Sequence, residues 1–208
     1  MKRILLLTIL AVFLVAGSAS AALILTIDDG VNPVITVTDG AGSDPLDGVV
    51  QFFGAVGNWT TNISTGVSAD SLAAPLLLDL LSVDTTSSAG GSLVLTLSDS
   101  GFGPHAGTLV SEVGGTTSGA TVSFYTLING SPVSGIGPMT TGTAFSGSAS
   151  GNASFGAGDT VSLMAVISHG AASTTSFDFS TKVPEPATLL LLGAGLVSVG
   201  LVRRKARG

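Results

Sequence analysis

The chain has 208 residues, no cysteine and a formal net charge of −6, and 10% of its residues are charged. All seven basic residues lie outside the segment 22–181, which contains twelve of the thirteen acidic residues. This distribution argues against nucleic-acid binding, which draws its affinity from Lys and Arg contacts with phosphates. The lack of cysteine excludes disulfides, thiolate metal sites and thiol nucleophiles.

Residues 1–21 have the three zones of a secretory signal peptide. Two basic residues are followed by an apolar run from Ile4 to Val15 and then by small residues that end at Ala21. We expect cleavage after Ala21, because an apolar run of about 12 residues is shorter than the ~20 that a transmembrane helix needs. Residues 22–181 would then form an extracytoplasmic domain.

This central segment is predicted to be all-β. No window in it keeps a helical apolar period over three turns, whereas apolar residues recur at every second position between turn signals. The alternating runs lie at 35–37, 93–97, 120–128, 161–167 and 177–179. Asn129-Gly130 suits a type I′ turn between two strands. About nine to eleven short strands indicate an antiparallel β-sandwich, for which a jelly-roll-like topology is one option.

Two parts of the segment have more than one interpretation. Residues 71–82 space their leucines as a short helix would, but we favour a strand over 76–83 that forms a hairpin with the strand at 93–97. Residues 140–158 are almost wholly Gly, Ala, Ser and Thr, a composition typical of flexible linkers. Phe145 and Phe155 within that stretch favour packing, so we expect one domain.

Sequence signatures of catalysis are missing from the central segment. It contains no Gly-x-Ser-x-Gly motif, only one glutamate, Glu112, and two histidines, His105 and His169. We expect both histidines to be exposed at loop ends and the domain to be non-enzymatic. We expect Trp59, the sole tryptophan, to be a core ring rather than a sugar-stacking platform.

Five aspartates form the best candidate for a metal site. They lie within twenty residues, in turn contexts: Asp28, Asp29, Asp39, Asp44 and Asp47. Carboxylate oxygens in loops are the ligands that Ca²⁺ prefers, and a divalent ion would relieve repulsion among carboxylates that have no basic partner. Neither string fits an EF-hand. The alternative is that these side chains only hydrogen-bond the backbone of their own turns.

The last 27 residues, 182–208, have three consecutive parts. A short extended linker contains Val183, Pro184, Glu185 and Pro186. Residues 187–202 carry no charge and would form a helix of about 24 Å, short for a ~30 Å hydrocarbon core. The tail 203–208 then stops translocation and faces the cytoplasm by the positive-inside rule. Its first three residues are Arg203, Arg204 and Lys205.

This order of Pro-Glu-Pro, short apolar helix and basic tail resembles the PEP-CTERM sorting signal of Gram-negative bacteria. The resemblance implies that exosortase, a membrane-embedded cysteine peptidase or transpeptidase, cuts near the Pro-Glu-Pro and removes the helix and the basic tail. It also implies an exported protein that is transiently anchored, then left in the cell envelope or extracellular matrix and associated with exopolysaccharide or biofilm. An ordinary single-pass anchor is the alternative.

The resemblance does not extend to the central domain. For that domain we expect a surface or matrix role without catalysis, and the alternative is a binding module for calcium or glycan. No cofactor is expected apart from Ca²⁺.

Overall fold

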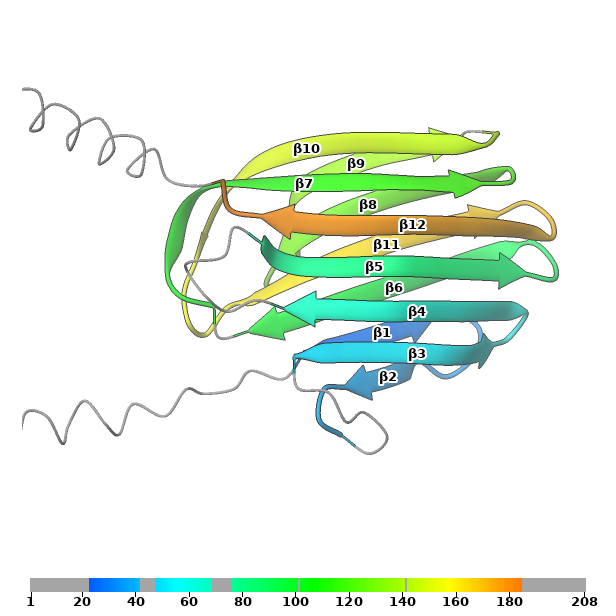
Figure 1. Ribbon diagram of the computed structural model, residues 1–208, viewed down its shortest axis with the longest axis horizontal. Helices are drawn as coiled ribbons and strands as arrows, with labels where there is room; N and C mark the ends of the chain where they lie inside the picture. Colours follow the sequence, from blue (N-terminus) through cyan, green and yellow to red (C-terminus); the bar gives the residue numbers. More distant parts are fainter. Residues whose placement is uncertain (1–22, 42–47, 69–75, 101, 141, 185–208) are drawn as a thin grey trace, which may run out of the picture.

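The computed structural model describes residues 23–41, 48–68, 76–100, 102–140 and 142–184. In these ranges the chain forms twelve β-strands and no helix, so none of it is a helix long and apolar enough to cross a membrane. Two six-stranded antiparallel sheets face each other (Figure 1). The predicted all-β antiparallel sandwich is therefore confirmed. The signal peptide expected at 1–21 and the helix expected at 187–202 lie outside the described residues.

The strands vary from short edge segments to long central ones. In chain order they are β1 (Ile24–Asp28), β2 (Ile35–Thr38), β3 (Val49–Val56), β4 (Trp59–Ser68), β5 (Leu76–Ser87), β6 (Gly91–Ser100), β7 (His105–Thr117), β8 (Ala120–Ile128), β9 (Ser131–Thr140), β10 (Ala144–Phe155), β11 (Thr160–His169) and β12 (Ser173–Lys182).

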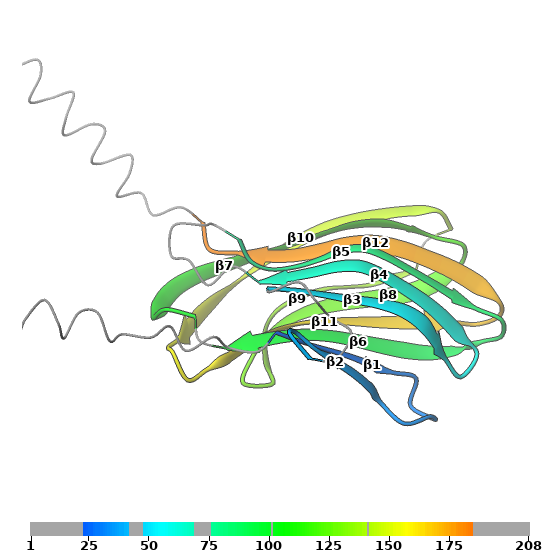
Figure 2. The ribbon, with the colours of Figure 1, turned by 60° about the horizontal axis from the view of Figure 1, so that its bottom comes forward.

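The strand order is that of an extended jelly roll. Sheet A runs β2-β1-β6-β11-β8-β9 and sheet B runs β10-β7-β12-β5-β4-β3. The eight strands β5 to β12 pass from one sheet to the other at every connection except the β8–β9 hairpin, and this gives the two four-stranded halves of a jelly roll. The hairpins β1–β2 and β3–β4 extend these halves on one side (Figure 2).

The predicted hairpin between the strands at 76–83 and 93–97 is wrong. β5 lies in sheet B and β6 lies in sheet A, so the loop between them crosses the sandwich. The physical reason is that both strands carry a fully buried apolar face. Leu78 and Leu80 on one sheet and Leu95 and Leu97 on the other are all 0% exposed, because the two faces meet across the core.

A bulge near the middle of β5 breaks its two-residue alternation of buried residues. Ser82 has a positive φ of 50°, and the register with β12 shifts between Phe177 and Phe179. The shift lets Leu80 and Val83, three residues apart, both point into the core. The Ser82 amide donates to Asp178 Oδ1 at 2.6 Å, so the bulge leaves this donor satisfied.

Phenylalanines fill one half of the core. Phe124 of β8 contacts Phe145 of β10 and Phe177 and Phe179 of β12, with ring centroids 5.9, 5.0 and 5.1 Å apart. These contacts join both sheets. Trp59 is 1% exposed and belongs to the same continuous core, which confirms its predicted burial.

The Gly/Ala/Ser-rich stretch is packed, as Phe145 and Phe155 indicated. It forms β10, an edge strand of sheet B that lies close to β9 of sheet A. A Cβ at Gly147 would lie 2.5 Å from Ile136 Cγ2, and one at Gly151 would overlap the carbonyl oxygen of Val133. Small residues are needed here because the two sheets close on each other at this corner.

We expect Gly151→Ala to lower the free energy of unfolding by about 1–3 kcal/mol, because its Cβ would force the β9 backbone away. Gly114→Ala on β7 is the matched control, since a Cβ there meets nothing within 4 Å. Urea unfolding of both variants measures the difference. Equal stability of the two variants would contradict the close approach of β9 and β10.

Candidate functional site

The junction between the sandwich and the C-terminal segment is built on the last strand. β12 lies inside sheet B, paired with β7 on one side and β5 on the other. β1 begins and β12 ends at the same end of the sandwich, here called the terminal end (Figure 1). Pairing with both neighbours continues through Lys182, so Thr181 and Lys182 belong to the sheet rather than to a linker.

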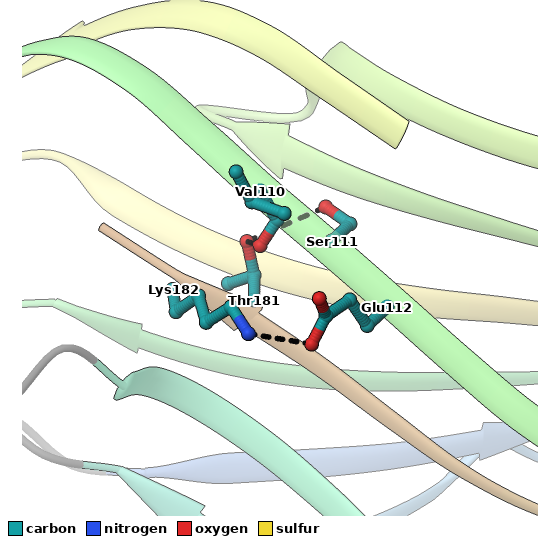
Figure 3. A network of polar contacts seen from close by, with 5 residues as sticks. All are labelled: Val110, Ser111, Glu112, Thr181 and Lys182. Carbon is teal, nitrogen blue, oxygen red and sulfur yellow. Dashed lines mark hydrogen bonds and ion pairs between the residues drawn. The ribbon is translucent and has the colours of Figure 1, made fainter. Parts of the chain in front are cut away.

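On the inner face, Thr181 joins a buried group of hydroxyls. Ser111 Oγ lies 2.7 Å from Thr126 Oγ1, 2.7 Å from Ser134 Oγ and 3.4 Å from Thr181 Oγ1. Thr181 Oγ1 also donates to the carbonyl oxygen of Val110 at 3.4 Å (Figure 3). All four hydroxyl side chains are buried, and Thr181 is 0% exposed. The group ties β12 to β7, β8 and β9 beneath the junction.

On the outer face, Lys182 forms an ion pair with Glu112 of β7. Nζ lies 2.6 Å from Oε2, and the two side chains are 37% and 50% exposed (Figure 3). Lys182 is the only Lys or Arg from residue 22 to 184, and Glu112 is the only glutamate in that range. An exposed pair of this kind contributes roughly 0–1 kcal/mol. We call Ser111, Glu112, Thr181 and Lys182 together the terminal clasp.

The first proline of the Pro-Glu-Pro sequence lies close behind the terminal clasp. Val183 is partly buried against the core, and Pro184 is exposed. Glu185 and Pro186, like the basic residues 203–205, lie outside the described residues. The folded domain therefore extends to within two residues of the first proline.

A carboxyl group with an unusually high pKa lies beside the same strand. Asp79 of β5 pairs in register with Ser180 of β12. Burial, and secondly the charge of Asp178, raise the pKa of Asp79 to about 6. Its Oδ1 has no hydrogen-bond partner among the described residues. The sandwich thus holds a carboxylate at neutral pH in a place that disfavours its charge.

The predicted metal ligands that are described bind the backbone of their own loops. Asp28 accepts from the Gly30 amide at 2.8 Å, and Asp39 Oδ2 accepts from the Gly48 amide at 2.8 Å. Asp29 accepts from the Asn32 amide at 2.8 Å and its side chain at 2.7 Å, and these bonds lower the pKa of Asp29.

Asp44 and Asp47 lie outside the described residues. Within the described ranges, no three His, Asp or Glu side chains gather as a metal site requires. The hydrogen bonds of Asp28, Asp29 and Asp39 agree with the turn interpretation, and calcium binding stays a prediction.

The expectation that His169 is exposed is wrong. It is 2% exposed at the end of β11 and stacks on Trp59, with ring centroids 4.6 Å apart. Its Nδ1 lies 2.7 Å from Ser87 Oγ and its Nε2 lies 2.9 Å from Thr175 Oγ1. Burial lowers the pKa of His169. Ser87 is 1% exposed, so this serine–histidine pair is sealed inside the sandwich and is not open to a substrate.

His105 is neither fully exposed nor in a turn. It begins β7, is half-buried, and its ring lies 5.2 Å from that of Phe155. Its Nε2 is buried without a hydrogen-bond partner among the described residues.

Sequence reasoning found the motif but missed the terminal clasp. Glu112 and Lys182 are 70 residues apart, and only the β7–β12 register brings them together. The one available signal was that Lys182 is the only Lys or Arg between residues 22 and 184, so any ion pair of a Lys or Arg in that range had to use it.

Comparison with known proteins identifies the tail. Residues 182–205 match the PEP-CTERM protein-sorting motif, which confirms the resemblance seen in the sequence. No curated protein matches the chain.

Several solved structures share a general likeness with the chain. TmCBM61 in complex with β-1,4-galactotriose is 15% identical with a TM-score of 0.38, and the match covers 63% of this chain and 92% of that one. The PA14 sugar-binding domain from an RTX adhesin is 14% identical with a TM-score of 0.31, covering 77% and 90%. The C-terminal CBM6 of LamC from Zobellia galactanivorans is 13% identical with a TM-score of 0.28, covering 47% and 90%. Scores this low carry no argument about what this chain binds.

Asp79→Asn should stabilise the domain at pH 7.5, on the order of 1 kcal/mol after allowance for solvent screening, and should have little effect at pH 3.5. A raised pKa means that stability is present below the ordinary value of 3.8 and is lost as pH rises through about 6. Denaturant unfolding at both pH values measures this.

Asp159→Asn is the matched contrast for this experiment. Hydrogen bonds from the Asn129 side chain and the Gly156 amide lower the pKa of Asp159, so its loss should destabilise the domain at pH 7.5. If Asp79→Asn destabilises the domain at pH 7.5, as Asp159→Asn is expected to do, the assigned environment of Asp79 is wrong.

Proposed function

We propose that this chain is an exported, non-enzymatic surface or extracellular-matrix protein whose C-terminal segment is removed by an exosortase. The observation that carries the proposal is the PEP-CTERM sorting motif at 182–205, which begins on the last paired residue of the sandwich. In this proposal the chain crosses the inner membrane, is held briefly by residues 187–202, and is then released to the envelope or matrix.

The geometry of the junction supports this order of events. Every described strand lies before the first proline of the motif, so a cut near Pro-Glu-Pro removes none of them. The sandwich would leave as an intact unit. Because the chain leaves at the terminal end, the turns at 57–58, 88–90 and 170–172, which lie at the opposite end, would face away from the membrane before cleavage (Figure 1).

The charge of the domain bears on an association with exopolysaccharide. Between residues 22 and 181 there are twelve acidic residues and no basic one. Such a surface repels acidic polysaccharides, unless divalent cations bridge the two. Association with a neutral glycan would have to use hydrogen bonds instead. The proposed matrix role therefore makes the calcium dependence of binding informative.

Replacing both Pro184 and Pro186 by Ala, or deleting residues 203–207, should leave the protein in the membrane fraction and larger by the uncut tail. The reason is that the first change removes the extended proline motif and the second removes the basic stop. Membrane fractionation and intact-mass measurement of the protein from cells that carry an exosortase check the prediction.

A matched control for the double variant is Pro104→Ala, which changes an exposed proline outside the matched motif. It should be processed like the wild type. Recovery of full-length wild-type chain from mature envelopes, or an unchanged product mass in the tail variants, would contradict processing by exosortase.

The alternative role, a calcium- or glycan-binding module, has its own test. Isothermal titration of the processed protein with Ca²⁺ and with neutral and acidic exopolysaccharides, the latter with and without Ca²⁺, measures binding directly. If Ca²⁺ relieves carboxylate repulsion at a bound site, millimolar CaCl₂ should raise the melting temperature more than NaCl of equal ionic strength. No heat of binding, together with equal thermal shifts, would remove this alternative.

A further inference from the structure

We propose that Glu112 is a positioning residue for processing: through Lys182 it holds the end of β12 in the sheet and so limits how much peptide the exosortase can engage. This inference rests on the proposed function, because it concerns the same junction. It adds that the folded domain itself sets the rate at which the motif becomes accessible.

The exosortase and sheet B would compete for the same stretch of backbone. A peptidase binds its substrate as an extended segment, usually through main-chain hydrogen bonds on both sides of the cut. Only Val183 separates the end of β12 from Pro184, and residues 180–182 are paired with β7 and β5. An enzyme that needs these residues must take them from the sheet.

The last two residues of β12, Thr181 and Lys182, are held in the sheet with different strength. Apart from its backbone pairing, Lys182 is held by one exposed ion pair, and its register with β5 is already shifted between Thr181 and Lys182. Thr181 is 0% exposed and bonded within the buried hydroxyl group around Ser111. Opening at Lys182 therefore costs little, whereas opening beyond Thr181 would expose the buried hydroxyls.

The rate of cleavage depends on how often the end of β12 opens. When a segment opens and closes faster than it is cut, cleavage follows the population of the open form. Loss of an exposed ion pair shifts that population modestly, which corresponds to a change of about two- to fivefold in cleavage rate. Replacing Glu112 by a cation should shift it further, since Lys182 would then be repelled.

The test uses the full-length chain in cells that contain exosortase, with pulse-chase measurement of the fraction cut. Glu112 lies on β7, outside the motif at 182–205, so its variants leave the recognised sequence unchanged. We expect Glu112→Gln to be cut about two- to fivefold faster than wild type, Glu112→Lys faster still, and Glu112→Asp at nearly the wild-type rate.

Asp84→Asn is the control for charge. It removes a carboxylate from an exposed position on the neighbouring strand β5, where Asp84 accepts a hydrogen bond from Ser176 and not from Lys182. Its cleavage rate should equal that of wild type. Hydrogen exchange on the uncut chains provides a second readout: protection of the amides at 181–183 should fall in Glu112→Gln and Glu112→Lys, while the rest of β12 stays protected.

The outcomes separate the two proposals. If the wild-type chain is never cut, the proposed function fails. If wild type is cut and the Glu112 variants are cut at the same rate as Asp84→Asn, the positioning role is wrong and the enzyme engages only residues beyond Val183. A general loss of stability is recognised because it would lower protection throughout β12 rather than at its last residues.

Discussion

The insertion of β12 between β5 and β7 is the contact on which the rest of this structure depends. Sheet B consists of two parts, β10-β7 and β5-β4-β3, that are joined by hydrogen bonds only through β12. The same strand contributes Phe177 and Phe179 to the aromatic core. Without disulfides, this pairing and the burial of apolar faces are what stabilise the sandwich. The fold therefore needs the chain up to Lys182, the residue on which the sorting motif begins.

This arrangement joins folding to sorting. Because the last strand is central and not an edge, the sandwich cannot be complete until the residues beside the motif have emerged and paired. The terminal clasp secures those residues from both faces, with a buried hydroxyl inside and an ion pair outside. A cut after this point leaves the described sandwich whole, whereas a cut within β12 would open sheet B. In the proposed function, the position of the prolines directly after β12 therefore protects the domain from the cut.

Electrostatics separate the interior from the surface. The interior polar groups are mainly uncharged hydroxyls and one histidine, His169, which is held between Ser87 and Thr175. The described carboxylates lie mostly at turns or on the outer faces, where backbone amides donate hydrogen bonds to them or solvent surrounds them. Asp79 and Asp99 are the exceptions: burial and Asp178 raise the pKa of Asp79. Asp99 is 6% exposed and accepts from the Ser100 amide at 2.7 Å. Lys182 is the only Lys or Arg between residues 22 and 184, and it forms the only ion pair of the described residues at this junction.

By itself the sequence determined the β class, six of the twelve described strands, the Asn129-Gly130 turn and the sorting motif, because alternation, turn chemistry and a linear signal are local properties. Asn129 and Gly130 have φ of 49° and 77°, as a type I′ turn requires. Only the tertiary structure decided that β5 and β6 face each other across the core, that His169 is buried, and that Glu112 meets Lys182. Each of these depends on which strands become neighbours. Alternation states which side of a strand is apolar but not which strand it will meet, and a bulge such as that at Ser82 changes even the side.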